Sequence, residues 1–442
     1  MSLVSLYNHL KEFFFAPRSP LPLALYRIAL AIIILQDLVI MLLPDFKLYY
    51  GDNAIVPIDQ MAAYWWRLEP YFDMMVLLPP GEQWRYAFVI VMIILAIMMM
   101  FGLCFRFSSV ALWLCILSLD NHFQLNQNSG DNFIKFSTMI ICMSNAGDAL
   151  SIDNLIRAAR EDWRQTGFAP RLSAPWAQRM LQLQLAFVYF HSFVCKIQGQ
   201  AWINGEACYY ASRYEDMVRF PMPFLFENLW ACKILTWFTL VIECFLFTLI
   251  WFKETCYWVL LGGLFLHGGI EYTTNLPMFE WLFMCVYVTF VEPEDLAKVM
   301  DLVRAKVQPL FGAPYLVSYD GHCILCTRTV GLIHRLDIFR CLNFVDFREQ
   351  ENKAILSAVE ESRLEKEMLL KSKDGFVGGF FAFRLISLLC PLLWPLVPIL
   401  YIPGVSLIGQ KVYEWCAEHR YLFLGSNCEG EVCLRPKTQV AG

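Results

Sequence analysis

The sequence predicts a polytopic α-helical membrane protein, with about eight transmembrane helices, that carries a small α/β domain near its C-terminus. The chain of 442 residues is 58% hydrophobic and only 17% charged, a balance typical of proteins that cross a bilayer several times. Its apolar residues gather in long runs between residues 21 and 292. A short β-like run that leads into a Cys-x-x-Cys motif predicts the attached domain.

Charge and cysteine content exclude two other classes. The net charge of −5 gives no polybasic character, so no nucleic-acid partner is expected. Nine of the sixteen cysteines lie between Cys104 and Cys285, mostly in apolar runs, where cysteine usually acts as a small hydrophobic residue. The cysteine count therefore does not predict a disulfide-rich secreted fold. The first apolar run, 21–44, is too long for a cleavable signal peptide.

Residues 1–20 form a short amphipathic lead-in, and 21–292 form the predicted transmembrane domain. Several of its apolar runs are short for a hydrocarbon core of about 30 Å, so seven to nine spans are compatible with the pattern. The eight expected spans lie at about 22–43, 88–103, 110–119, 132–145, 178–197, 233–252, 256–270 and 277–291.

The distribution of Lys and Arg predicts the orientation. With eight spans, the basic loop at 147–177 lies on the same side as both ends of the chain. Basic loops favour the cytoplasmic side, so both termini are predicted to be cytoplasmic in a multi-pass inner-membrane protein. The end of the fifth span, with Lys196, then lies on the outer side together with His122 and Asp131.

The stretch from Gln184 to Tyr210 carries the first candidate site. Lys196 closes an apolar helix, and its ammonium either reaches water by snorkelling or faces a pocket where it serves as a base. His191 lies about 140° from Lys196 around a helix and shares a face with Cys195 instead.

Four further ionisable residues lie within apolar runs: Asp37, Glu243, His267 and Glu280. Each is costly against lipid, by about 2.5–3.5 kcal/mol or more for the carboxylates, so all four are expected to face the helix bundle. Two interpretations remain open. The residues form structural ion pairs between helices, or they line a pocket with a base and proton carriers.

The pattern YF-x5-KIxGxxWINGEAxYY, from Tyr189 to Tyr210, resembles the HTTM domain, the membrane region shared with vitamin K-dependent γ-carboxylases. Arg27, the hinge at 128–131, Glu243 and the HGGI stretch from His267 occur in the matching order, and the resemblance covers about 15–292.

This resemblance implies that Lys196 is the base that deprotonates reduced vitamin K. The chain departs from the carboxylases because it lacks their long lumenal region for a protein substrate. A pocket for a quinone or hydroquinone, or for another lipophilic molecule, is less affected by this departure. The candidate pocket residues are His122, Asp131, His191, Trp202, Glu243 and His267.

A connector at 293–313 is predicted to be an amphipathic helix that starts at Pro293 and ends at Pro309. The second candidate site follows it. A strand at 315–319 leads through a turn to Cys323 and Cys326 at the start of a helical pattern, which is the thioredoxin-type arrangement. The partial positive charge of a helix N-terminus favours the thiolate form of Cys323. Asp320 and His322 are expected to support that thiolate.

Three interpretations of this motif stay open. In the redox interpretation, Cys323 attacks a disulfide and Cys326 resolves the intermediate. In the second, the pair binds zinc together with Cys428 and Cys433, although their spacing is poor for a zinc site and no metal is expected. In the third, the cysteines are structural or vestigial.

The stretch YDGHCILC resembles the DCC-type thiol–disulfide oxidoreductases, which implies a thioredoxin-like domain over about 314–435, followed by a tail at 436–442. The expected second strand lies at 344–347. The apolar segment 386–403 is not expected to be a ninth span, because four prolines interrupt it.

Together these features favour a membrane redox enzyme that combines thiol–disulfide exchange with a pocket for a quinone-like molecule. A carboxylase-like enzyme that modifies a peptide or lipid by oxygenation is the second hypothesis. A non-catalytic carrier or assembly factor is the third. The expected partners are the lipid bilayer and a peptide or protein thiol.

Overall fold

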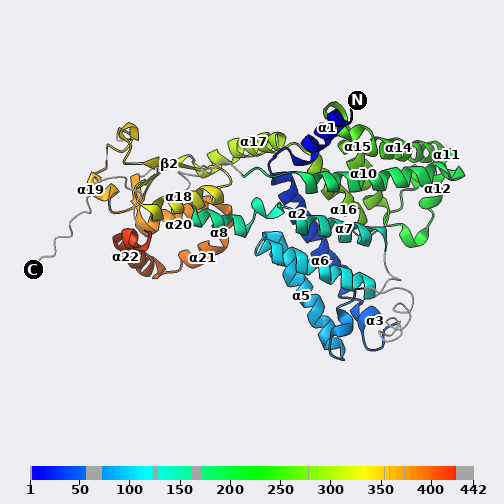
Figure 1. Cartoon of the computed structure of the whole chain (residues 1–442), viewed down its shortest axis with the longest axis horizontal. Coiled ribbons are helices and arrows are strands. Elements are labelled where there is room, and N and C mark those ends of the chain that lie inside the picture. The colour runs from blue at the N-terminus through cyan, green and yellow to red at the C-terminus, as the bar shows by residue number, and fades with distance from the viewer. Residues whose placement is uncertain are drawn as a thin grey trace, which may run out of the picture. The chain divides into compact units, whose positions relative to one another are not determined.

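The computed structural model describes residues 2–55, 72–122, 128–161, 171–276, 278–352, 354–357, 359–372 and 375–424 (Figure 1). The chain divides into two compact units. The first comprises Met1–Asp153 and Arg171–Pro293, and the second comprises Asn154–Pro170 and Glu294–Gly442. The first unit ends at Pro293, where the sequence analysis expects the connector to begin. No pattern in the sequence indicates that the segment beginning at Asn154 belongs with the second unit. The tail at 436–442 lies outside the described residues.

The first unit is helical, and each of the eight predicted spans overlaps a helix. Shorter helices lie in the connections: α1 (Leu3–Phe15), α3 (Phe46–Tyr50), η2 (Met75–Leu77), η4 (Ala146–Asp148), α11 (Gln200–Ile203), α12 (Ala207–Ala211), η5 (Glu215–Met217), α13 (Pro223–Phe226) and η6 (Leu249–Trp251). The main helices are α2 (Leu21–Gln36) with its continuation η1 (Asp37–Leu42), α5 (Glu82–Phe101), α6 (Phe105–His122), α7 (Ser129–Met143), α10 (Trp176–Ile197), α14 (Leu229–Phe247), α15 (Lys253–Thr273), and α16 (Phe279–Val286) with its continuation η7 (Tyr287–Phe290).

Four of the described helices are long and apolar enough to cross a membrane, which supports a multi-pass membrane protein but does not confirm eight spans. They are Leu21–Leu42, Glu82–Phe101, Trp176–Ile197 and Leu229–Phe247. The other predicted spans fall short for physical reasons. The apolar helix Phe279–Phe290 extends only about 18 Å at 1.5 Å per residue. Helix α6 carries Arg106 near its start and Asp120 near its end.

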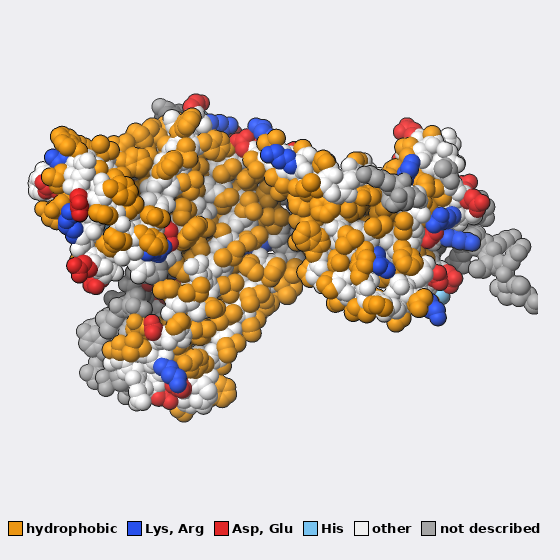
Figure 2. All heavy atoms as spheres, turned by 180° about the vertical axis from the view of Figure 1, so that it is seen from behind, with side chains coloured by type: hydrophobic (Ala, Val, Ile, Leu, Met, Phe, Trp, Pro, Cys, Tyr) orange, Lys and Arg blue, Asp and Glu red, His pale blue; other side chains and the backbone are white. Residues whose placement is uncertain are grey.

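The surface of the first unit is apolar, as expected for a body immersed in lipid. Figure 2 shows hydrophobic side chains spread broadly over it, with few charges between them. Side chains that face outward include Ile90 and Ile94 of α5, Phe187 of α10, and Trp258 and Phe265 of α15. A helix that is hydrophobic on its outer as well as its inner side is typical of a membrane span.

Arg27 of α2 ties together the connections at one end of the first unit. Its side chain is wholly buried. Its guanidinium donates hydrogen bonds to the carbonyl oxygens of Ala146 and Leu150, both at 2.5 Å, and of Ala149 and Met100, at 3.2 and 3.3 Å. Helix ends leave carbonyl groups without partners inside the helix, and the arginine supplies donors to them.

The second unit is built on a four-stranded mixed sheet in the order β2-β1-β3-β4. Strand β1 (Tyr315–Tyr319) runs parallel to β2 (Leu342–Asp346) and antiparallel to β3 (Leu369–Ser372), which pairs antiparallel with β4 (Gly375–Gly378). The predicted first strand is confirmed, and the second covers 342–346 in place of 344–347. The helical elements of this unit are α17 (Pro293–Phe311), α18 (Ile324–Leu336), η8 (Gln350–Asn352), α19 (Glu361–Leu364), α20 (Gly379–Leu389), η9 (Pro391–Leu396), α21 (Val397–Leu400) and α22 (Val405–Leu424). Helix α8 (Ile152–Arg160) lies where the two units divide.

The connector helix corrects one prediction about proline. Helix α17 begins at Pro293 as predicted, but it continues past Pro309 to Phe311. It ends at Gly312, whose φ of 69° is left-handed. A glycine in this conformation commonly terminates a helix, because it adopts the left-handed turn without steric cost. Gly312, and not Pro309, therefore determines where α17 ends.

The apolar segment 386–403 is broken where its prolines predict. Helix α20 ends at Leu389, before Pro391, and the following apolar helical stretch is bent away from it by 120°. Proline removes a backbone donor and clashes with the preceding turn, so one straight helix cannot continue through this segment.

Replacing Arg27 with leucine should destabilise the first unit strongly. The substitution leaves four carbonyl oxygens without their donor, and a single buried group left unsatisfied costs about 1–3 kcal/mol. Thermal unfolding in detergent should show a large fall in melting temperature. Arg106→Leu is the control, because Arg106 is exposed and makes two hydrogen bonds at the same end. Equal effects of the two substitutions would contradict the anchoring role.

Candidate functional sites

The two cysteines of the Cys-x-x-Cys motif lie at the start of α18, directly after β1. Cys323 is the N-cap residue, and its sulfur accepts a hydrogen bond from the backbone N–H of Cys326 at 3.2 Å. The two sulfur atoms lie 2.7 Å apart, with the Cys326 thiol donating to Cys323. The strand and the helix start thus hold the two sulfurs close enough to exchange a proton or to form a disulfide.

The hydrogen bonds divide the two thiols into a stronger and a weaker acid. The bond from the Cys326 thiol, aided by the Cys326 backbone N–H and by the positive charge of Arg420, lowers the pKa of Cys323 despite its burial. The same bond between the sulfurs, together with burial, raises the pKa of Cys326. The pair therefore favours the thiolate form at Cys323 and the thiol form at Cys326.

Solvent access to the two cysteines is the reverse of what the predicted roles require. An attacking sulfur has to reach its substrate, yet Cys323 is 0% exposed. Cys326, the predicted resolving cysteine, is partly exposed and lines a cavity. Cys326 is therefore the more accessible of the two sulfurs, and which of them attacks a substrate stays a prediction.

The predicted support of the thiolate by Asp320 is corrected. Asp320 is buried, and its negative charge raises the pKa of Cys323. Its carboxylate is held by Arg348 at 3.2 Å and by Arg420 at 3.6 Å, and it accepts the backbone N–H of His322 at 3.1 Å. The His322 residue itself is exposed. Asp320 thus organises the turn and its arginines, and Arg420 supplies the charge that favours the thiolate.

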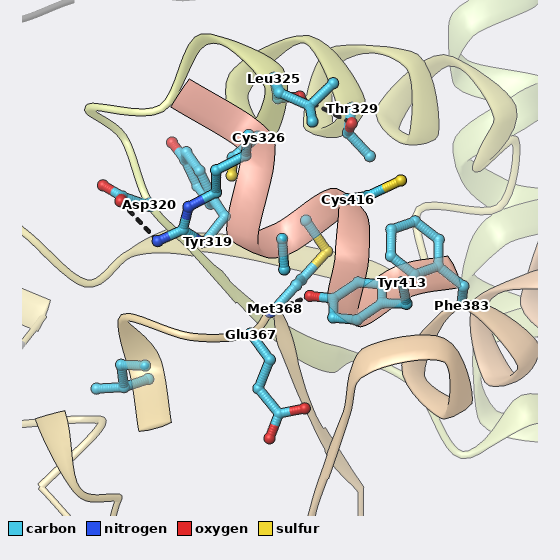
Figure 3. A pocket seen from close by; sticks show the side chains of 13 residues that line it. Tyr319, Asp320, Leu325, Cys326, Thr329, Glu367, Met368, Phe383, Tyr413 and Cys416 are labelled. Atoms are coloured by element: carbon cyan, nitrogen blue, oxygen red, sulfur yellow. Dashed lines mark hydrogen bonds and ion pairs between the residues drawn. The ribbon is translucent and has the colours of Figure 1, made fainter. Parts of the chain in front are cut away.

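A cavity of about 180 Å³ opens beside Cys326 (Figure 3). Helices α18, α20 and α22 and strand β1 contribute to its walls, which are mainly apolar and aromatic. The lining side chains are Tyr319, Asp320, Leu325, Cys326, Thr329, Leu364, Glu367, Met368, Phe383, Tyr413, Cys416, Ala417 and Arg420.

In the first unit, Lys196 forms an ion pair with Glu243 across α10 and α14. The Lys196 ammonium also lies 4.8 Å from the centre of the Trp202 ring, in cation–π geometry. Ser192, one turn earlier on α10, donates to the same Glu243 oxygen at 3.3 Å. The structure therefore brings together three predicted residues, and the ammonium is held by a carboxylate and a ring instead of extending freely into water.

A second buried network surrounds His267 of α15. Its Nδ1 pairs with the carboxylate of Glu280, and its Nε2 lies 2.5 Å from the hydroxyl of Tyr189. The Tyr189 hydroxyl lies 2.8 Å from that of Tyr287. When the imidazole is neutral, the hydrogen bonds can all run in one direction. Tyr287 then donates to the Tyr189 hydroxyl, Tyr189 donates to Nε2 of His267, and Nδ1 of His267 donates to Glu280.

The other three pocket candidates lie in other surroundings. His191 is exposed, and its ring lies 3.8 Å from the Cys195 sulfur on the face of α10 that the sequence predicted. Asp131 forms a capping box with Asn128 at the start of α7. His122 is buried in an ion pair with Asp73 at 2.8 Å. These interactions give each of the three a local structural role.

No group of three or more potential metal ligands occurs among the described residues. Cys428 and Cys433, which the zinc interpretation requires, lie outside them.

The fold and its two sites define a membrane protein with an attached thiol redox domain. Comparison with protein families gives the particular assignment. Residues 15–294 match the HTTM domain, and residues 317–426 match the DCC1-like thiol-disulfide oxidoreductases. Because the HTTM match covers more than half of the chain, the chain belongs to the HTTM family. The two predicted resemblances are thus confirmed, in the predicted order. No solved structure matches the chain.

Sequence reasoning missed several residues that complete these sites. Arg420 and Tyr413, both on α22, lie about ninety residues after the cysteines, so no local spacing connects them with the motif. Tyr287 was read as part of an apolar run. A tyrosine or arginine within an apolar helix could have indicated a site residue, because the polar end of a buried side chain needs a partner.

A double-mutant cycle tests the network at His267. Glu280→Leu leaves the imidazole without its buried acceptor and should cost about 3–5 kcal/mol of stability. The double variant Glu280→Leu/His267→Leu should recover part of that loss, because it removes both polar partners. Melting temperatures in detergent give the comparison, with exposed Glu254→Leu as control. Additive effects of the two substitutions would contradict the pairing.

Proposed function

We propose that this HTTM protein is a membrane thiol–disulfide oxidoreductase whose reacting groups are Cys323 and Cys326. The observation that carries the proposal is the sulfur pair at the start of α18. Its atoms lie 2.7 Å apart, and one sulfur is favoured as thiolate while the other lines a cavity. The mixed sheet order and the match to DCC1-like thiol-disulfide oxidoreductases support a thioredoxin-like domain with this activity.

The reaction starts from the reduced Cys323–Cys326 pair, whose two sulfurs carry one proton between them. The Cys326 proton passes to the Cys323 thiolate, and the Cys326 sulfur attacks one sulfur of a substrate disulfide. A mixed disulfide forms, and the other substrate sulfur leaves as a thiolate. Cys323 then gives up its proton and attacks the Cys326 sulfur, which releases the second substrate thiol and leaves a Cys323–Cys326 disulfide. The substrate class is a peptide or protein disulfide, and the reverse reaction oxidises thiols.

The first unit has a second candidate function, the binding of a hydroquinone in a carboxylase-like site. Among the described residues, the Oε2 atom of Glu243 is buried without a hydrogen-bond partner, and Lys196 and Trp202 lie beside this carboxylate. A hydroxyl of a hydroquinone would supply the missing donor. When bound, the hydroquinone would supply the reaction with oxygen, while Lys196 and Glu243 would orient it and accept its proton. The Lys196→Ala variant should lose a co-purified quinone detectable by mass spectrometry.

The predicted orientation places Cys323 and Cys326 on the cytoplasmic side of an inner membrane, together with both termini. In a reducing compartment the pair is kept as thiols and is available to transfer electrons. The bilayer and a thiol-containing partner on that side are the proposed partners.

Trapping of mixed disulfides distinguishes the two sulfurs. If Cys326 attacks, the Cys323→Ser variant treated with oxidised glutathione should accumulate a glutathione adduct on Cys326, because the resolving sulfur is missing. Cys326→Ser should give much less adduct, because Cys323 is buried. Peptide mass spectrometry locates the adduct, with the double serine variant as control. Accumulation only in Cys326→Ser would reverse the assignment, and no adduct in either would contradict the exchange activity.

The pH dependence of alkylation tests the charges around the pair. Arg420→Gln removes a positive charge that lowers the pKa of both Cys323 and Cys326, so the labelling rate should reach half its maximum at higher pH. Asp320→Asn removes a negative charge that raises both pKa values, so the profile should move to lower pH. Mass spectrometry of the peptide containing the pair separates its labelling from that of other cysteines. Shifts in the same direction would contradict the electrostatic account.

A further inference from the structure

The cavity beside Cys326 has walls suited to a flat, lipophilic ring. The aromatic side chains of Tyr319, Phe383 and Tyr413 contribute to its lining, together with Leu325 and Met368. Its volume is about 180 Å³. An apolar cavity of about 150 Å³ is large enough to bind benzene, so a single substituted ring fits a space of this size.

Tyr413 offers a hydrogen-bond donor at this cavity. Its hydroxyl oxygen accepts the backbone N–H of Met368 at 2.8 Å, and no acceptor for its own hydrogen is found among the described residues. Burial raises the pKa of Tyr413 to about 12, so the phenol keeps its proton at neutral pH. Figure 3 places Tyr413 and Cys326 on different walls of the same cavity. A carbonyl oxygen on a ring is the complementary acceptor for such a donor.

We propose that this cavity binds the ring of a quinone, which accepts electrons from the Cys323–Cys326 pair, and this inference rests on the redox activity proposed above. The ring lies among the aromatic walls, Tyr413 donates to one of its carbonyl oxygens, and Cys326 is the sulfur that meets it. The cavity thus provides a second site for quinone chemistry, located in the redox domain and separate from the Lys196–Glu243 pair.

The electron balance of this step closes without another reactant. The Cys326 sulfur forms a bond to a ring carbon, and the ring takes up the electron pair on a carbonyl oxygen. The Cys323 sulfur then attacks the Cys326 sulfur, which forms the S–S bond, breaks the S–C bond and leaves that electron pair with the ring. The two thiol protons end on the two ring oxygens. One dithiol and one quinone therefore give one disulfide and one hydroquinone.

The membrane setting supports a quinone as the ligand. The HTTM unit belongs to the bilayer, where lipophilic quinones dissolve, and the redox domain is part of the same chain. The lining of this cavity consists mainly of apolar and aromatic side chains, which suit a lipophilic ring.

The test uses the full-length protein in detergent, reduced and freed of excess reductant, with duroquinone as probe. The ring carbons of this benzoquinone all carry methyl groups, which disfavours permanent thiol adducts. Loss of quinone absorbance gives the rate, and differential alkylation with mass spectrometry reads disulfide formation at Cys323 and Cys326. The proposal predicts formation of one Cys323–Cys326 disulfide for each duroquinone reduced.

Two variants separate the cavity from the sulfur pair. Ala417→Phe fills the cavity and should slow duroquinone reduction by at least about tenfold, equivalent to ~1.4 kcal/mol in the barrier. Its reaction with oxidised glutathione, which needs access to the Cys326 sulfur but not the space for a ring, should fall by a smaller factor. Tyr413→Phe removes the hydroxyl, which is both the proposed donor to the quinone and the acceptor of the Met368 N–H, and should slow duroquinone selectively. Exposed Glu418→Phe, on the same helix, should leave both rates unchanged.

Three results would overturn the inference. Duroquinone reduction that is unaffected by both Ala417→Phe and Tyr413→Phe would show that the quinone reacts elsewhere. Equal losses with duroquinone and glutathione in both variants would show that the cavity does not select a quinone. A wild-type pair that exchanges with glutathione but ignores duroquinone would refute the quinone site while leaving the exchange activity intact. Failure with both probes would instead refute the proposed function.

Discussion

A charged or polar side chain in apolar surroundings requires a partner, and this constraint organises the first unit. Arg27 satisfies four carbonyl oxygens, Lys196 pairs with Glu243, and His267 lies between Glu280 and Tyr189. Each partnership joins segments that are distant in sequence. Apolar packing alone leaves helices free to slide or rotate in lipid, whereas these polar contacts fix which faces of α10, α14 and α15 meet.

The helices of the membrane unit could be predicted from the sequence, but their pairing could not. Apolar runs locate helices because each span has to bury or expose a continuous hydrophobic surface. The same runs do not identify neighbouring helices, so Lys196 and Glu243 could each be recognised as candidates but not as a pair. The number of membrane spans could not be predicted from the sequence either. Helices such as α6 and α15 combine apolar stretches with polar ends, and among the described helices only four are long and apolar enough for a span.

In the redox domain, the local pattern predicted the strand, the helix start and the position of both cysteines. It also predicted that the thiolate form is favoured at Cys323, but it could not show which sulfur is accessible or which distant charges act on the pair, because both depend on the packing of other elements. Arg420 reaches the pair from α22 and favours the thiolate, whereas Asp320, which is adjacent in sequence, opposes it. The burial of Cys323 and the cavity beside Cys326 likewise follow from packing that spacing cannot reveal.

The central claim is that Cys323 and Cys326 cycle between a dithiol and a disulfide while the protein resides in its membrane. The most direct measurement equilibrates native membranes with glutathione buffers of graded redox potential and then reads each cysteine by differential alkylation and mass spectrometry. We predict one reversible two-electron transition in which Cys323 and Cys326 are oxidised and reduced together. Cysteines that stay reduced at every potential, or that oxidise independently of each other, would contradict it.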